Sequence, residues 1–313
     1  MSSFRSITES DLPRVLACEV DEPIGSISAD RYLAEAADGM YRPEWTWIAE
    51  RDGRILARAL WWGPADSAHP VALDCLYVDA QVEDRAAIGA ELIAASLRAF
   101  RAAGADRLPL YNVTLTGGWR EDPAASAALA WRREAALAAG LSHEVERLRF
   151  EWSPDVGVPA GSGRLTFTEA DDDAFLAVFR RIAEGSLDAE TRKGLAAHGP
   201  EVVARQEMDF YLGCPGRREW WRLAHTADGT LVGLAIPSAT PYHPNVGYLG
   251  VVPELRGRGY VADLLAEITR LHADRGAELI TATTDTTNAP MVAAFRRAGY
   301  RTTEVRMVFS APE

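Results

Sequence analysis

Residues Asn245 to Leu265 read N-V-G-Y-L-G-V-V-P-E-L-R-G-R-G-Y-V-A-D-L-L, and this stretch decides the fold. Its first part is rich in strand-forming residues. Pro253 ends that strand because proline has no backbone N–H to donate to a sheet. Gly257 and Gly259 then permit a tight turn, since glycine adopts left-handed backbone angles at low cost. Apolar residues at helical spacing follow, which predicts a helix that begins near Arg258.

A glycine-rich turn that opens a helix is expected to bind an anion. Several N–H groups point at one spot, and the positive end of the helix dipole lies there. Arg256 and Arg258 add charge in a geometry that suits phosphate. Two other phosphate motifs are excluded: Ala262 replaces the third glycine of G-x-G-x-x-G, and Lys193, the only lysine, is not in a P-loop. The remaining alternative is a helix start that binds no ligand.

The turn resembles the acyl-CoA loop of the GCN5-related N-acetyltransferase (GNAT) superfamily, V-x-P-x-x-R-G-x-G-x-[GA]-x-x-L. Val261 departs from this pattern because the family prefers Gly or Ala there. The residues that match are Val251, Pro253, Arg256, Gly257, Gly259 and Leu264.

A second motif, N-A-P-M-V-A-A-F-R-R-A-G-Y from Asn288 to Tyr300, resembles the family pattern N-x-x-A-x-x-x-Y-x-x-x-G-[FY]. Asn288 fits as a contact of the pantetheine arm, and it also suits a helix cap. Phe295 stands where the family often has a tyrosine that protonates the leaving thiolate. Phenylalanine has no proton to give, so water, another side chain or no acid serves here.

The resemblance implies acetyl-CoA as cosubstrate and no metal. The pantetheine arm would bond the backbone of Val251 and Val252, and the N–H of Gly250 or Val251 would hold the thioester oxyanion. No base is evident: Asp285 and Tyr248 are candidates, and a solvated turn carboxylate or a core ring are the plainer interpretations. The residues expected around the pyrophosphate are Arg256, Gly257, Arg258, Gly259, Tyr260 and Val261.

Composition bounds the class of protein. The chain has 313 residues, which favours two domains, and a formal net charge of -12, which disfavours a nucleic-acid partner. There is no apolar run long enough to span a membrane and no signal peptide. Three scattered cysteines form neither a disulfide framework nor a metal motif, which indicates a reducing cytoplasm. The wealth of arginine and alanine resembles that of proteins from GC-rich bacterial genomes.

The two halves repeat one order of elements. The turn at Asp52-Gly53 matches the turn at Asp228-Gly229, and Ala139-Gly140 matches Ala298-Gly299. We therefore expect an α/β fold of two tandem acetyltransferase-like domains, each a mixed, mainly antiparallel sheet flanked by helices. The expected domains are residues 1–152 and 164–313, joined by a Pro/Gly/Ser-rich linker at 153–163.

The first half lacks the acyl-CoA loop, since Glu83 and Asp84 bring negative charge to the matching place. We expect it to be a degenerate scaffold or one wall of the acceptor site. The resemblance implies an N-acetyltransferase that acts on the amine of a small molecule, as a monomer or homodimer. Two alternatives stay open: a non-catalytic acyl-CoA sensor, and a transferase with a longer acyl group or a hydroxyl acceptor. The failed G-x-G-x-x-G disfavours a nucleotide-binding oxidoreductase.

Overall fold

The computed structural model describes residues 2–312, which divide into two compact units. The first unit holds the chain up to Glu146 together with the residues from Val305 onward. The second unit is Arg147–Glu304. Each unit is described by itself below.

The first unit is built on a sheet whose strands follow one another in the order β1-β2-β3-β4-β5, with β12 beside β5. All neighbours are antiparallel except β4 and β5, which are parallel. The tight turn predicted at Asp52-Gly53 joins β2 to β3. The bounds are β1 Ser3–Ser6, β2 Thr46–Arg51, β3 Arg54–Trp62, β4 Ala72–Val78, β5 Leu110–Leu115 and β12 Arg301–Ser310.

Helices cover the sheet of the first unit. The paired helices α3 and α4 bury apolar residues such as Leu92 and Leu129. Helices α1 and α2 contribute Val15 and Tyr32 to separate apolar clusters with strand residues. The bounds are α1 Leu12–Leu16, α2 Ala29–Ala37, α3 Arg85–Ala102 and α4 Pro123–Ala138.

The second unit repeats this plan in the order β6-β11-β10-β9-β8-β7. Here β10 and β11 are the parallel pair, and the other neighbours are antiparallel. The predicted turn at Asp228-Gly229 joins β8 to β9. The bounds are β6 His143–Trp152, β7 Leu165–Thr168, β8 Arg222–Thr226, β9 Leu231–Ala239, β10 Pro244–Val251 and β11 Ile280–Asp285.

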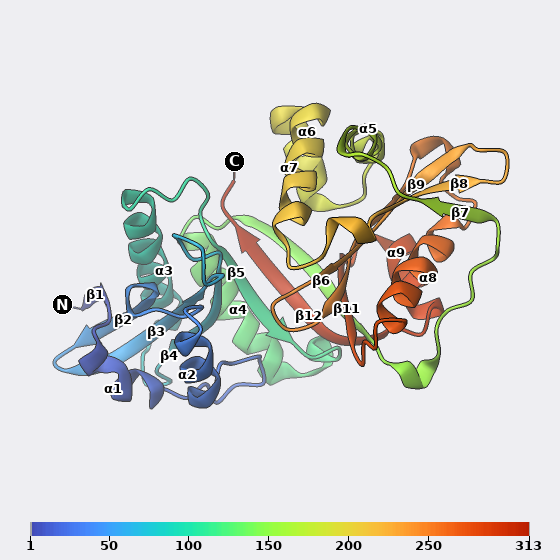
Figure 1. Ribbon diagram of the computed structural model, residues 1–313. Helices are drawn as coiled ribbons and strands as arrows, with labels where there is room; N and C mark the ends of the chain where they lie inside the picture. Colours follow the sequence, from blue (N-terminus) through green and yellow to red (C-terminus); the bar gives the residue numbers. More distant parts are fainter. Residues whose placement is uncertain (1, 313) are drawn as a thin grey trace. The chain divides into compact units, whose positions relative to one another are not determined.

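Helices α5 (Asp172–Ala183), α6 (Ala189–His198) and α7 (Pro200–Gly213) gather on one side of the second sheet, and α8 (Tyr260–Ala273) and α9 (Ala289–Arg297) on the other (Figure 1). The side of the sheet that α5 covers holds a buried apolar cluster. Its members include Phe175, Phe179 and Trp221, which pack with Leu234 and Ile236 of β9. The expected α/β class, with a mixed and mainly antiparallel sheet in each unit, is confirmed.

The units do not coincide with linear halves of the chain. Residues 147–152 of β6 pair with β11 in the second unit, although they end the first half of the sequence. Residues 305–309 of β12 pair with β5 in the first unit, although they end the second half. Each unit is thus closed by a strand from the other half of the sequence. The order of the elements along the chain does not reveal this, because strands far apart in the sequence choose these pairings.

Candidate functional site

The predicted anion turn lies between β10 and α8. A short 3-10 turn, Pro253–Leu255, follows the strand, and the helix begins at Tyr260, two residues later than predicted. Gly257 and Gly259 have φ of +77° and +80°, values at which a side chain is strained. Across residues 2–312, we see no group that accepts a hydrogen bond from the backbone N–H groups of residues 257–261. These N–H groups are therefore available to an anion.

Arg256 has a different task from the one that the motif predicts. Its guanidinium donates to the carbonyl oxygens of Ile182 (2.7 Å), Glu184 (3.0 Å) and Gly185 (2.8 Å), and its Nε donates to Val251 (3.0 Å). The first three are carbonyls at the end of α5, which have no partner within that helix. Arg256 therefore fastens the turn to α5. Its N–H groups donate to backbone carbonyls rather than to a phosphate.

Arg258 is the motif arginine left for an anion. Its side chain is exposed, and no hydrogen bond or ion pair of its guanidinium is seen within the described part of the chain. Val261 is half-buried in the first turn of α8, and Tyr260 lies under the guanidinium of Arg164 at 4.8 Å.

Arg164, which the motifs did not reveal, supports the turn. It donates to the carbonyl oxygen of Arg258 (3.2 Å) and to the carboxylate of Asp263 (2.9 Å). The buried Asp263 also accepts from the N–H of Ser162 at 2.6 Å. Burial opposes ionisation, but the hydrogen bonds from Ser162 and Arg164 outweigh it and lower the pKa of Asp263. The end of the predicted linker is thus tied to the start of α8.

Beside the turn, β10 has one open edge. It pairs with β11 at Asn245–Thr281, whereas its pairing with β9 continues to Val251. The N–H of Val252 donates to Val232 of β9 at 2.9 Å. Because successive residues of a strand point their backbone groups to opposite sides, Gly250 also faces β9, and Leu249 and Val251 face the open edge.

This alternation corrects two predictions about backbone donors. Val252 and Gly250 are not free to bond an acyl carrier, because their N–H groups belong to the ladder with β9. Within residues 2–312 no acceptor is seen for the N–H of Val251 or Leu249, so both can do so; the motif did not indicate Leu249. Gly250 is needed for packing instead, since a Cβ there would lie 2.5 Å from the Ile182 side chain.

A β-bulge between Asn245 and Tyr248 marks where the two strands part. The side chain of Asn245 donates to the Thr281 carbonyl at 3.0 Å and accepts from the N–H of Gly247 at 2.6 Å. Its own carbonyl contacts Nε2 of the buried His272 at 3.0 Å. Asn245 thus holds the closed end of the opening between β10 and β11.

Tyr248 faces α5 and α7. Its ring packs 5.2 Å from Phe179 and 5.8 Å from Tyr211, and the Tyr211 hydroxyl donates to the carbonyl of Gly247 at 3.4 Å. Burial, reinforced by the negative charge of Glu207, raises the pKa of Tyr248 far above its usual range. Tyr248 therefore stays protonated and can act as a hydrogen-bond donor but not as a base.

Asp285, the other candidate base, is occupied. Its carboxylate is almost fully buried and accepts from Arg147 Nε at 2.9 Å and from the N–H of Ala189 at 2.8 Å. Both oxygens are therefore engaged in tying β6 and the start of α6 to the end of β11. The geometry assigns Asp285 to holding the site together, not to taking a proton.

Glu207 on α7 is the titratable group that the sequence did not single out. Burial, and next the negative charge of Asp188, raise the pKa of its carboxyl to about 7, while Arg147 opposes them. Nothing local distinguishes Glu207 in the sequence, because these neighbours belong to other elements.

The second motif occupies α9. Asn288 caps the helix by accepting from the N–H of Met291 at 3.4 Å, as its capping role predicted. Phe295 is buried and stacks on Phe150 at 4.9 Å, with Tyr300 at 5.3 Å. Phe295 is therefore a core residue of the second unit, and its predicted contact with a cofactor is not what this packing favours.

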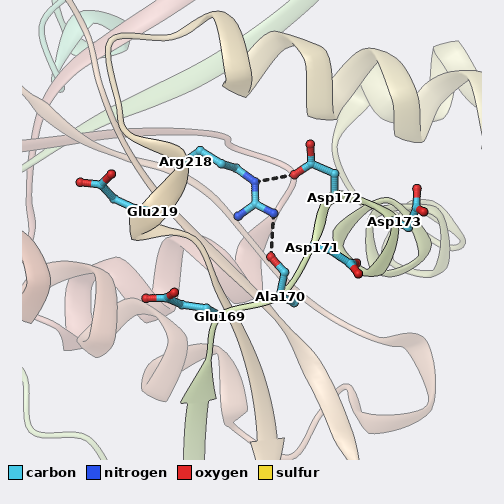
Figure 2. Close-up of a pocket in the computed structure, with 7 residues that line it drawn as sticks. All are labelled: Glu169, Ala170, Asp171, Asp172, Asp173, Arg218 and Glu219. Carbon is cyan, nitrogen blue, oxygen red and sulfur yellow. Dashed lines mark hydrogen bonds and ion pairs between the residues drawn. The ribbon is translucent and has the colours of Figure 1, made fainter.

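A separate hollow opens near the start of α5 (Figure 2). Arg218 lies in it and donates to Asp172 at 2.7 Å and to the carbonyl of Ala170 at 2.9 Å. Carboxylates dominate the remaining lining, so a phosphate would be repelled there. This hollow shares no residue with the turn or with the open edge of β10. The lining residues are Glu169, Ala170, Asp171, Asp172, Asp173, Arg218 and Glu219.

In the first unit, the position that corresponds to the opening between β10 and β11 is filled by the chain itself. The parallel pair β4 and β5 meets at Leu73–Tyr111, and further along β5 the carbonyl of Thr114 accepts from the N–H of Gly25 at 2.7 Å. Asp84 caps the start of α3 by accepting from Ala87 at 2.8 Å. The segment before α2 thus lies on β5 where the second unit has its opening.

Glu22 anchors this segment. Its carboxylate accepts from Arg85 (2.9 Å), from the fully buried Arg132 (2.6 Å) and from the indole N–H of Trp131 (3.0 Å). Burial alone would raise the pKa of Glu22, but these hydrogen bonds outweigh it and lower the pKa to about 2. Arg85 and Arg132 also donate to the Val78 and Leu76 carbonyls of β4. The open edge of β4 is therefore already satisfied.

Within residues 2–312, no helix is both long and apolar enough to cross a membrane. In the same part of the chain, we find no cluster of three or more His, Cys, Asp or Glu side chains placed to hold a metal ion.

Comparison with known proteins finds a family match over part of the chain. Residues 191–300 match the model of the acetyltransferase (GNAT) family. A mycothiol acetyltransferase from Clavibacter michiganensis subsp. michiganensis (strain NCPPB 382) is 30% identical over 151 residues, which cover 46% of this chain and 44% of that protein. The match thus spans less than half of that relative.

Solved structures share the fold over nearly all of the chain. A GCN5-related N-acetyltransferase from Sphaerobacter thermophilus has a TM-score of 0.57 at 18% identity, covering 98% of this chain and 94% of that one. A tandem GNAT protein from the clavulanic acid biosynthesis pathway has a TM-score of 0.51 at 17% identity, covering 99% and 98%. At these identities the likeness concerns the fold alone.

Proposed function

We propose that this chain, which carries a domain of the acetyltransferase (GNAT) family at residues 191–300, moves an acetyl group from acetyl-CoA to the amine of a small molecule. The observation that carries the proposal is the open edge of β10, which leads directly into a turn of free N–H groups. One surface thus offers donors for an extended, amide-bearing arm and for a pyrophosphate. Free cysteines at 18, 75 and 214 support a reducing cytoplasm as the location.

The residues present suit acetyl-CoA as cosubstrate. The N–H groups of residues 257–261 and the guanidinium of Arg258 would hold the pyrophosphate. The N–H of Val251 would bond the pantetheine arm as an added strand does, and the N–H of Leu249, farther from the turn, would face the thioester. Asn288, whose side-chain oxygen caps α9, has its amide NH₂ to offer to the same arm.

The chemistry is direct attack within a ternary complex. The amine nitrogen bonds to the thioester carbonyl carbon, the carbonyl oxygen takes up negative charge, and the carbon–sulfur bond then breaks. The N–H of Leu249 would stabilise that oxygen. The thiolate leaves and takes a proton from water, because Phe295 has none to supply and the raised pKa of Tyr248 makes its hydroxyl a poor acid. A thiolate is a stable enough leaving group that weak acid catalysis suffices.

CoA binding tests the turn. The double variant G257A/G259A introduces side chains at two positive-φ positions, and G229A/G276A does the same at turns outside the site, with φ of +84° and +80°. Calorimetry should give at least a tenfold weaker CoA dissociation constant for G257A/G259A, with similar losses of melting temperature in both. Equal CoA affinity in the two double variants would exclude the turn as the pyrophosphate site.

The second candidate is a non-catalytic acyl-CoA sensor, which the buried Phe295 and the occupied Asp285 favour. Thiol release from acetyl-CoA, measured with tyramine, spermidine, glucosamine and lysine, separates the two. Binding of CoA with no thiol release above the rate in water for any acceptor would favour the sensor. Mass analysis of products, with ethanolamine and longer acyl-CoA donors included, distinguishes N-acetylation from hydroxyl or longer-chain transfer.

A further inference from the structure

The face of α7 that covers β10 is fixed by Tyr211. Its ring lies 5.8 Å from that of Tyr248, and its hydroxyl reaches the Gly247 carbonyl at 3.4 Å. Side chains four residues apart on a helix lie on the same face, one turn from each other. Glu207 is four residues before Tyr211, so it lies on this face and one turn along.

Glu207 also interacts electrostatically with groups on the far side of the opening between β10 and β11. Its carboxyl interacts electrostatically with Tyr248 of β10, with Asp188, which caps α6, and with Arg147 of β6. Arg147 is held by Asp285, at the end of β11. Since β10 and β11 run parallel from Asn245–Thr281 and the bulge adds one residue to β10, Asp285 is about level with Gly250 along the sheet. Groups from both sides of the opening therefore influence the charge of Glu207.

We propose that Glu207 is the group that takes the proton from the attacking amine, a role that rests on the proposed function. The carboxylate accepts one N–H proton of the acceptor as nitrogen bonds to the thioester carbon. That proton passes through solvent to the departing thiolate, so the products are the amide and free CoA, and Glu207 returns to its starting state. Tyr211 acts as a positioning residue, because its bond to Gly247 fixes α7 across the strand.

The charges around Glu207 suit this role. Burial keeps its carboxyl near half-protonated at neutral pH, where a base both accepts and returns protons readily. Tyr248 and Tyr211 have pKa values raised by burial, so both remain neutral donors next to it. The remaining charged neighbours, Asp188 and Arg147, oppose each other in their effect on it.

The test compares E207Q with D209N, an exposed carboxylate on the same helix. Thiol release from acetyl-CoA is followed against pH with the four amines above and with water alone. We expect E207Q to lower kcat by about a hundredfold with CoA affinity within twofold of wild type. D209N should stay within twofold in both. The rise of the wild-type rate near pH 7 should vanish in E207Q.

A second measurement needs no acceptor. Carbon-13 NMR of glutamate-labelled protein should show one carboxyl that titrates near pH 7 and is missing from E207Q. Retention of more than half the wild-type kcat in E207Q, or titration of every glutamate below pH 5.5, overturns the proposal for Glu207. Failure of wild type to bind CoA would instead overturn the proposed function, so the two failures are distinguishable.

Discussion

The guanidinium of Arg256 donates to the carbonyl oxygen of Ile182 at 2.7 Å, which fastens the end of α5 to the turn before α8. Arg256, the arginine that defines the motif in sequence, thus stabilises the backbone by hydrogen bonds. The neighbouring Arg258 is left to meet a phosphate. The two arginines should therefore respond differently to the same substitution.

R258A is expected to weaken CoA binding about fivefold without changing the melting temperature, because an exposed charge pair is worth roughly 1 kcal/mol. The loss should shrink at high salt. R256A should instead lower the free energy of unfolding by about 2 kcal/mol, since it leaves carbonyls without partners. Calorimetry and urea unfolding of both variants check this. A salt-sensitive binding loss in R256A with unchanged stability would contradict the division of roles.

E207Q should be more stable than wild type above neutral pH. The folded pKa of about 7 exceeds the ordinary value of 4.5, so the folded state binds the proton more tightly. Wild-type stability therefore falls as pH rises from 4.5 through 7, by at most about 3 kcal/mol. Glutamine avoids that loss. Urea unfolding should show E207Q and wild type alike at pH 4.5 and E207Q more stable at pH 8, while D209N shows no such crossover.

F295Y probes the core of the second unit. Phe295 stacks on Phe150 and packs against the tilted ring of Tyr300, so a hydroxyl added to its ring enters a packed region. If the hydroxyl stays buried without a partner, the free energy of unfolding should fall by about 1–3 kcal/mol, with thiol release above half of wild type. Thermal melts and initial rates measure the two effects. A faster rate with unchanged stability would show that the position reaches the thiolate after all.

E22Q tests the role of Glu22 in anchoring the segment before α2 on β5 of the first unit. The change leaves the buried Arg132 without its counter-ion, so we expect a loss of roughly 3 kcal/mol at pH 7. The folded pKa of Glu22 lies below the ordinary value, so its contribution is present above pH 4.5 and is lost as pH falls through 2. The variant and wild type should therefore converge in acid.

The number of CoA molecules bound is the companion measurement. Wild type and E22Q should each bind one CoA per chain in calorimetry, because the turn of the second unit has no counterpart at the start of α3, where Asp84 is the cap. Binding of two per chain by wild type would contradict the assignment of the first half as a scaffold.

The sequence predicted those features that depend on neighbouring residues. The glycine turn, the hairpins at Asp52-Gly53 and Asp228-Gly229, and the cap at Asn288 follow from local chemistry, and the structure has all of them. The fold class followed from the repeat of elements.

The remaining features depend on residues far apart in the chain. Glu22 meets Arg132 across 110 positions, and Asp285 meets Arg147 across 138. Neither pairing leaves a local pattern. Arg256 matched its motif, yet its partners are set by where α5 ends. Glu207 becomes chemically distinct only through burial by other elements, which no spacing along α7 could indicate.

The placement of β12 has a consequence for synthesis on the ribosome. Residues up to Glu146 emerge first, but the strand that pairs with β5, Val305–Phe309, is translated only after the whole second unit. Until those residues are made, the edge of β5 that will receive β12 has no strand in place, which is a hazard for misassociation. The first unit can complete its sheet only once Val305–Phe309 have emerged. A chain cut short before Val305 would therefore lack a strand in the unit that was made first.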